Sequence, residues 1–170
     1  MLSALCFQSD GFVAKRTVVI GVGNLLLRDE GVGIHAVREL QKRALPPGVE
    51  VIDGGVAGVR LLDLFSGAQK LLLIDAAEMG LEPGAVARFT PEDVRFQSGD
   101  LKLSTHDVAL PEVLAIARAV SQCPSEVVII GVQPKEISWG TELTPEVRAA
   151  LPKVVELVLK EIGDSAEGGK

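Results

Sequence analysis

A glycine-containing turn directly after an apolar run is the feature that most constrains the fold of this chain. Residues 18–20 are Val-Val-Ile, residues 21–23 are Gly-Val-Gly, and apolar residues at helical spacing begin at Val32. A short β-branched run of this kind predicts a buried strand, which we place at residues 17–22. The stretch is therefore predicted to fold as a strand, a tight turn, an acidic loop and a helix.

The loop between this turn and the helix carries two adjacent carboxylates, Asp29 and Glu30. Such loops often bind phosphate, because a helix N-terminus attracts anions. Here the two acids already supply negative charge, so we expect a cation or a transferred proton instead. The third glycine of the dinucleotide-binding pattern is also missing, since Asn24-Leu25-Leu26 follows Gly23. A nucleotide-binding domain that uses Asp53 for the ribose stays an alternative.

The remaining chain alternates strand and helix patterns between glycine and proline breakers. The predicted strands are residues 17–22, 49–52, 70–74, 85–89 and 126–132, and the predicted helices are residues 32 to before 46, 58–66, 108–121 and 144–162. Residues 91–103 show no clear period and are predicted to be irregular. The alternation predicts a three-layer αβα fold, with a twisted, mainly parallel five-stranded sheet and helices on both faces. We expect one domain at residues 16–162, a flexible extension at 1–15 and a frayed tail at 163–170.

Composition and charge narrow the classes of function. A chain of 170 residues with 47% hydrophobic content suits one globular domain. Its net charge is -6, and its basic clusters are no longer than Lys15-Arg16, so we expect neither nucleic acid nor an anionic membrane as a partner. No apolar stretch approaches the ~20 residues of a membrane span. Two distant cysteines, Cys6 and Cys123, suggest a reducing compartment, and the cytoplasm is the predicted location.

The predicted topology brings two carboxylates together. Ligands of such sheets bind beyond the carboxyl ends of the strands, where the strand order switches. If the first strand lies between the second and the third, Glu30 and Asp75 meet there as an acid–base pair or as two metal ligands. His106 lies at a predicted helix start, where the dipole disfavours imidazolium and favours a neutral, metal-binding ring. Together the three residues would suit Zn, Ni or Co.

Each of these residues also has a purely structural interpretation. Glu30 could stabilise the first helix, Asp75 could cap a turn, and His106 could be a solvated helix-start residue. We predict that His35 serves surface or packing roles. The lone tryptophan, Trp139, is predicted to pack or to anchor a loop.

Five short blocks occur in the order and at the spacing of a known family. They are Gly21-Val22-Gly23-Asn24 with Asp29-Glu30-Gly31-Val32-Gly33; Asp53-Gly54-Gly55-Val56-Ala57-Gly58; Ile74-Asp75-Ala76; Ser104-Thr105-His106; and Ile130-Gly131-Val132-Gln133-Pro134 with Gly140 and Leu143-Thr144-Pro145. In these blocks the chain resembles the hydrogenase maturation endopeptidases, which trim the C-terminus of the nickel–iron hydrogenase large subunit. Glu30 stands where many members of that family have Asp.

The resemblance implies the same fold and the same peptide hydrolase activity. By position it implies that Glu30, Asp75 and His106 are the catalytic and metal-contacting residues. The implied metal is nickel, carried by the substrate and held weakly by the free enzyme, so the protease could be of the aspartyl type or metal-dependent. The implied partner is the nickel-loaded large-subunit precursor, on which a monomer would dock. We place Asp53, Gly54 and Gly55 at the edge of the substrate crevice.

Two competing functions stay open as alternatives. A non-catalytic, nickel-dependent assembly factor would bind the precursor through the same three residues without releasing a peptide. A nucleotide-binding α/β domain would instead rest on Gly21, Gly23 and Asp53.

Overall fold

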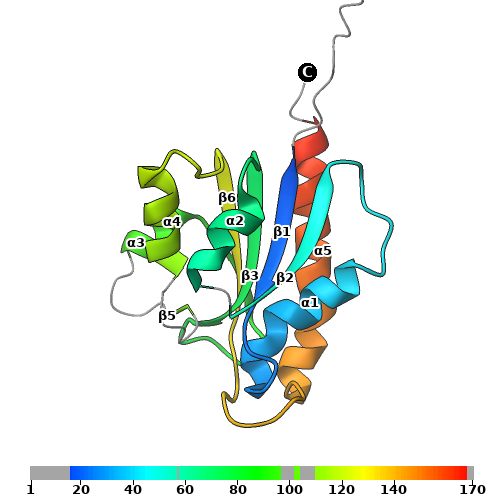
Figure 1. The fold of residues 1–170 in the computed structure, drawn as a ribbon. Helices are drawn as coiled ribbons and strands as arrows, with labels where there is room; N and C mark the ends of the chain where they lie inside the picture. The colour runs from blue at the N-terminus through cyan, green and yellow to red at the C-terminus, as the bar shows by residue number, and fades with distance from the viewer. Residues whose placement is uncertain (1–15, 57, 97–101, 104–109, 168–170) are drawn as a thin grey trace, which may run out of the picture.

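The structure is a computed structural model that describes residues 16–56, 58–96, 102–103 and 110–167 (Figure 1). The strands are β1 (Thr17–Val22), β2 (Val49–Gly55), β3 (Lys70–Glu78), β4 (Val86–Phe89), β5 (Lys102–Leu103) and β6 (Glu126–Val132). The helices are η1 (Arg28–Gly31), α1 (Val32–Leu40), η2 (Gly58–Arg60), α2 (Leu61–Phe65), α3 (Pro91–Phe96), α4 (Leu110–Ala119) and α5 (Pro145–Glu167).

The sheet is mainly parallel, as predicted. Its main path of five strands has the order β2-β1-β3-β6-β4, in which only the edge strand β4 runs antiparallel to its neighbour. The two-residue strand β5 pairs antiparallel with the far end of β3. Strand β1 therefore lies between β2 and β3, which is the arrangement that the predicted switch point requires.

Helices cover both faces of this sheet, so the fold has three layers. Helices α1 and α5 lie on one face, and α2 and α4 lie on the other (Figure 1). Side chains along β3 alternate between the two cores: Leu72 and Ile74 pack toward α1 and α5, while Leu71 and Leu73 pack toward α2 and α4. Because both faces are covered, the central strands are continuous apolar runs.

Residues 91–103, predicted to be irregular, contain α3 and β5, so that prediction was wrong. Thr90 and Asp93 explain the start of α3, because each accepts a hydrogen bond from the other's backbone N–H, at 2.7 Å and 3.4 Å. This is a capping box with Asp in place of the usual Glu or Gln. Such a short helix has too few turns to show a period in the sequence.

Several element boundaries also differ from the predictions. Strand β3 continues past Asp75 to Glu78, and α5 continues past the predicted end at residue 162 to Glu167. The second predicted helix, at residues 58–66, opens with the 3-10 turn η2 and continues as α2. Phe65 in α2 is buried, whereas Val59 in η2 is 47% exposed.

Candidate active site at the carboxyl edge of the sheet

The switch point lies where the pairing of β1 with β3 ends. The last residue of β1 that pairs with β3 is Gly21, which lies opposite Ile74. Asp75 is therefore the first residue of β3 without β1 beside it. On its other side Asp75 is still paired with Gly131 of β6. The alternation along β3 directs the Asp75 side chain to the face that α2 and α4 cover.

Close backbone packing brings the acidic loop to this point. A Cβ atom on Gly33 would lie 2.3 Å from the carbonyl oxygens of both Ile74 and Val22, so only glycine lets α1 start directly over the ends of β1 and β3. Glu30, in η1 just before α1, is held there with 0% of its surface exposed, and Asp75 is 1% exposed. The structure thus places both predicted carboxylates, buried, at the switch point.

The two acids of the loop have different roles, which the sequence did not distinguish. The Asp29 carboxylate is fully buried and accepts four hydrogen bonds from the segment after β6. Its Oδ2 accepts from the backbone N–H groups of Lys135 and Glu136, both at 3.0 Å, and from the Thr144 hydroxyl at 2.9 Å. Its Oδ1 accepts from the Thr144 N–H at 2.8 Å. Asp29 therefore ties the 135–144 loop to η1, and Glu30 stays the candidate catalytic acid of this pair.

The space beside the glycines of the turn is occupied by the backbone of η1 and α1. A Cβ on Gly23 would lie 1.8 Å from the carbonyl oxygen of Glu30, and one on Gly21 would lie 2.1 Å from that of Gly33. These glycines are needed for the close approach of η1 and α1 to β1. A phosphate cradle needs backbone N–H groups that are open to a ligand, so this packing argues against a nucleotide site.

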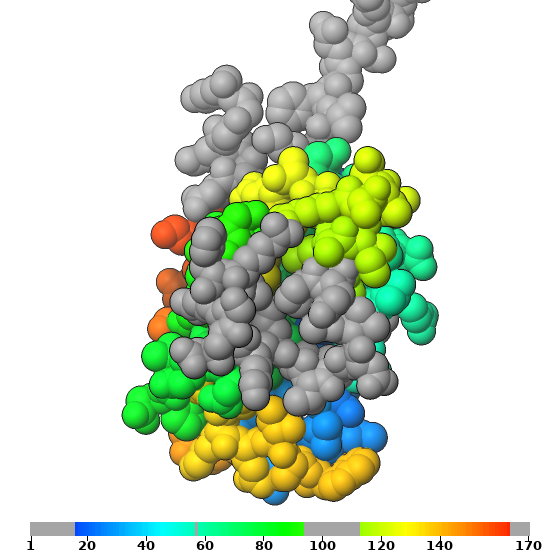
Figure 2. Space-filling model, turned by 90° about the vertical axis from the view of Figure 1, so that its left-hand side faces the viewer, coloured from blue at the N-terminus to red at the C-terminus, as the bar shows by residue number. Residues whose placement is uncertain are grey.

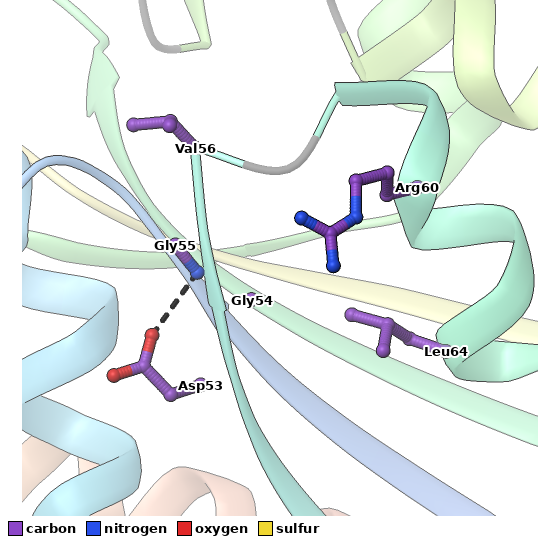
Figure 3. A pocket seen from close by; sticks show the side chains of 6 residues that line it. All are labelled: Asp53, Gly54, Gly55, Val56, Arg60 and Leu64. Atoms are coloured by element: carbon purple, nitrogen blue, oxygen red, sulfur yellow. Dashed lines mark hydrogen bonds between the residues drawn. The ribbon is translucent and has the colours of Figure 1, made fainter.

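The predicted crevice residues line a pocket beside this point. Asp53, Gly54 and Gly55, at the end of β2, line a cavity of about 360 Å³ together with Val56, Arg60 and Leu64 (Figure 3). The Asp53 carboxylate accepts a hydrogen bond from the Gly55 N–H at 3.0 Å and lies 3.7 Å from the Arg38 guanidinium. The Arg60 side chain faces the end of β2 across the cavity.

The third predicted ligand, His106, lies outside the described residues, as does the residue that would open its helix, Ser104. Within the ranges that the structure describes, no group of three His, Cys, Asp or Glu side chains is arranged to hold a metal ion. The role of His106 therefore stays a prediction. In those same ranges no helix has the length and apolar character needed to cross a membrane.

Sequence patterns missed two features of this region. Trp139 is 79% exposed, so of its two predicted roles, packing and anchoring a loop, the packing role was wrong. Arg60 in the cavity was not singled out, because a lone arginine two residues after a glycine carries no recognisable signal. The other histidine, His35, is half-buried on α1, in agreement with a surface or packing role. Burial and then the nearby charge of Arg38 lower its pKa.

Comparison with known proteins places these features in a family. The family model described as hydrogenase maturation protease matches residues 34–161. The chain is 36% identical over 152 residues to the hydrogenase expression/formation protein HupD of Bradyrhizobium diazoefficiens, covering 88% of this chain and 79% of that protein. It is 34% identical over 152 residues to the hydrogenase 2 maturation protease of Escherichia coli, covering 88% and 92%.

Solved structures agree with the sequence comparisons. The hydrogenase maturating endopeptidase HybD from Escherichia coli superimposes with a TM-score of 0.78 at 34% identity, covering 88% of this chain and 93% of that one. The [NiFe] hydrogenase maturation protease HybD from Thermococcus kodakarensis gives a TM-score of 0.73 at 28% identity, covering 86% and 99%. The fold and the family that the sequence blocks implied are thereby confirmed.

Proposed function

The chain belongs to the hydrogenase maturation proteases, and we propose that it removes a C-terminal peptide from the nickel-loaded precursor of a nickel–iron hydrogenase large subunit. The observation that carries this proposal is that two buried carboxylates, Glu30 and Asp75, both belong to segments that lie at the switch point of the sheet. Carboxylate oxygens at the carboxyl edge of a parallel sheet can bind a metal ion or accept a proton from water.

We assign the recognition of nickel to Glu30 and Asp75 together with His106. Carboxylate oxygens and an imidazole nitrogen are a donor set that suits a divalent nickel ion. Nickel is here a part of the substrate, so the three side chains complete a coordination that the precursor's own ligands begin. Substrate recognition through the metal explains how the protease distinguishes a loaded precursor from an empty one.

We place the catalytic step at the same residues. A carboxylate of Glu30 or Asp75 that accepts a proton from water would generate the nucleophile for the scissile carbonyl, as in general base catalysis. The precursor tail then lies along the end of β2, in the cavity lined by Asp53, Gly54 and Gly55. We further propose that the protein acts as a cytoplasmic monomer that docks on its larger substrate.

The test is the intact mass of the precursor after incubation with this protein. Nickel-loaded and nickel-free precursors are each incubated with the wild type, with Glu30→Gln and with Glu156→Gln. Glu156 is an exposed glutamate of α5 far from the crevice, so its variant controls for the loss of a negative charge. We expect a C-terminal mass loss only with nickel, with the wild type and with Glu156→Gln.

Other outcomes separate the alternatives. Cleavage of the nickel-free precursor would keep the protease and remove the recognition of nickel. A stable complex with no released peptide, for the wild type as well, would favour an assembly factor. Full cleavage by a folded Glu30→Gln variant would remove Glu30 from the reaction.

A further inference from the structure

The loops after β1 and β6 expose three large apolar side chains at the carboxyl edge of the sheet. Trp139 is 79% exposed, Leu26 is 54% exposed and Ile137 is 44% exposed. We call these three side chains the Trp139 platform. Figure 2 shows the segments that carry them, gold and blue, side by side at one end of the molecule. Exposed apolar side chains that gather in one place are typical of interaction surfaces.

The backbone under the platform is fixed by hydrogen bonds between the two loops. Leu27 and Gly140 form a parallel β-bridge, with the Gly140 N–H donating to the Leu26 carbonyl at 3.0 Å and the Arg28 N–H donating to the Gly140 carbonyl at 2.9 Å. Leu26 and Trp139 are therefore neighbours across this bridge. The Asp29 carboxylate holds the same two loops together. A surface that is already ordered loses little entropy on binding, which favours affinity.

The charged side chains around the platform are already paired with one another. The pairs are Arg28 with Glu136 at 3.6 Å, Lys135 with Glu146 at 2.6 Å, and Arg148 with Glu142. The rim is therefore charge-balanced, and the centre is apolar. Interfaces between proteins have this composition, with an apolar, aromatic core inside a polar rim. Among the described side chains of this rim, no unmatched charge is left to bind a flexible charged tail. An apolar surface of a folded protein would instead pack on the apolar centre.

The loop that carries Ile137 and Trp139 is tied to Asp29, the neighbour in sequence of Glu30. The Asp29 carboxylate is 3.0 Å from the backbone nitrogens of Lys135 and Glu136, which lead into Ile137. A protein whose cleaved segment reaches Glu30 would therefore bring its neighbouring surface close to this loop. We propose that the Trp139 platform docks on an apolar surface of the folded body of the hydrogenase precursor, adjacent to the tail that is removed. This proposal rests on the proposed function.

The chain offers a direct probe, because Trp139 is its single tryptophan. Protein labelled with 5-fluorotryptophan gives one ¹⁹F resonance, which reports on the platform alone. We expect that unlabelled, nickel-loaded precursor shifts or broadens this resonance in a saturable manner. A concentration series without precursor measures self-association in the same samples.

A matched pair of variants tests the contribution to catalysis. Trp139→Ala truncates an exposed side chain, so the fold should survive, and Val120→Ala truncates a residue that is 52% exposed, near the start of β6 at the opposite edge of the sheet. A central interface tryptophan typically contributes about tenfold or more to affinity. We expect Trp139→Ala to raise KM for the precursor about tenfold with little change in kcat, and Val120→Ala to leave both unchanged.

The outcomes distinguish this proposal from the proposed function. If the wild type cleaves the precursor while its ¹⁹F resonance does not move and Trp139→Ala keeps the wild-type KM, the platform proposal fails and the proposed function stands. If the wild type neither binds nor cleaves the precursor, both fail. A resonance that moves with protein concentration alone, together with a doubled mass in solution, would identify a homodimer contact and overturn the proposal.

Discussion

The contacts of Asp29 predict how two substitutions at one position should differ in stability. In Asp29→Ala, four hydrogen bonds to a buried carboxylate are lost, and the N–H and hydroxyl donors of Thr144 are left buried. The N–H groups of Lys135 and Glu136 are only partly buried, so water can replace their lost acceptor. With about 1–3 kcal/mol for each buried donor left unpaired, we expect the free energy of unfolding to fall by about 3–5 kcal/mol.

Asp29→Asn should be the milder change, because the two carboxylate oxygens accept different numbers of hydrogen bonds. Oδ2 accepts three hydrogen bonds and Oδ1 accepts one, from the Thr144 N–H. An asparagine that places its oxygen at the Oδ2 position keeps three of the four bonds, and its NH₂ group then faces a single N–H. The expected cost is about 1.5–3 kcal/mol, which is roughly half that of the alanine variant.

Equilibrium unfolding in urea measures both values. Far-UV circular dichroism follows the whole fold, and the fluorescence of Trp139 follows the 135–144 loop. Asp63→Ala, at an exposed position of α2, serves as the control and should cost less than about 1 kcal/mol. An alanine variant within 1 kcal/mol of wild type, or an asparagine variant as unstable as the alanine variant, would refute the proposed role of the Asp29 hydrogen bonds.

Other substitutions test the packing of the switch point and the charges at the opposite edge. Gly33→Ala should lower the free energy of unfolding, measured in thermal unfolding, by about 3 kcal/mol or more, because its methyl group would lie 2.3 Å from the Ile74 carbonyl oxygen. The methyl group of Gly163→Ala in α5 would meet no atom within 4 Å, so this variant should raise the free energy of unfolding by about 0.5–1 kcal/mol. Burial raises the pKa of Glu161, but the hydrogen bond and charge of Arg88 outweigh it and hold that pKa below its usual 4.5. Glu161→Gln should therefore cost about 1–3 kcal/mol at neutral pH, and its difference from wild type in urea unfolding should shrink as the pH falls below about 4.5. A difference that is constant with pH would contradict this assignment.

Much of the fold was predictable because buried parallel strands have a clear pattern in the sequence. Strands β1, β3 and β6 are continuous apolar runs, since helices cover both of their faces. The placement of Glu30 and Asp75 followed from the strand order rather than from any local motif. The short elements α3 and β5 were not predictable from periodicity, because six and two residues are too few to repeat a helical or a strand period clearly.

The separate roles of Asp29 and Glu30 could not be predicted, for a different reason. The two acids are neighbours in the same loop, and the partners of Asp29 lie more than a hundred residues later in the chain. Trp139 is a similar case. Its large apolar side chain favours packing, but the loop that carries it is held against η1 with this side chain exposed. Both outcomes depend on tertiary contacts that no local pattern encodes. The metal-contacting role of His106 remains a prediction.

The ties between Asp29 and the 135–144 loop also bear on when the protein becomes active during its synthesis. The ribosome makes both acids of the crevice early, but β3 gains its second parallel neighbour only when β6 has been made. The Asp29 bonds then span 106 to 115 residues, and contacts of such long range form late. A nascent chain that already contains Glu30 and Asp75 therefore still lacks the hydrogen bonds that fix η1 against the 135–144 loop. The candidate site takes its final form only near the end of synthesis.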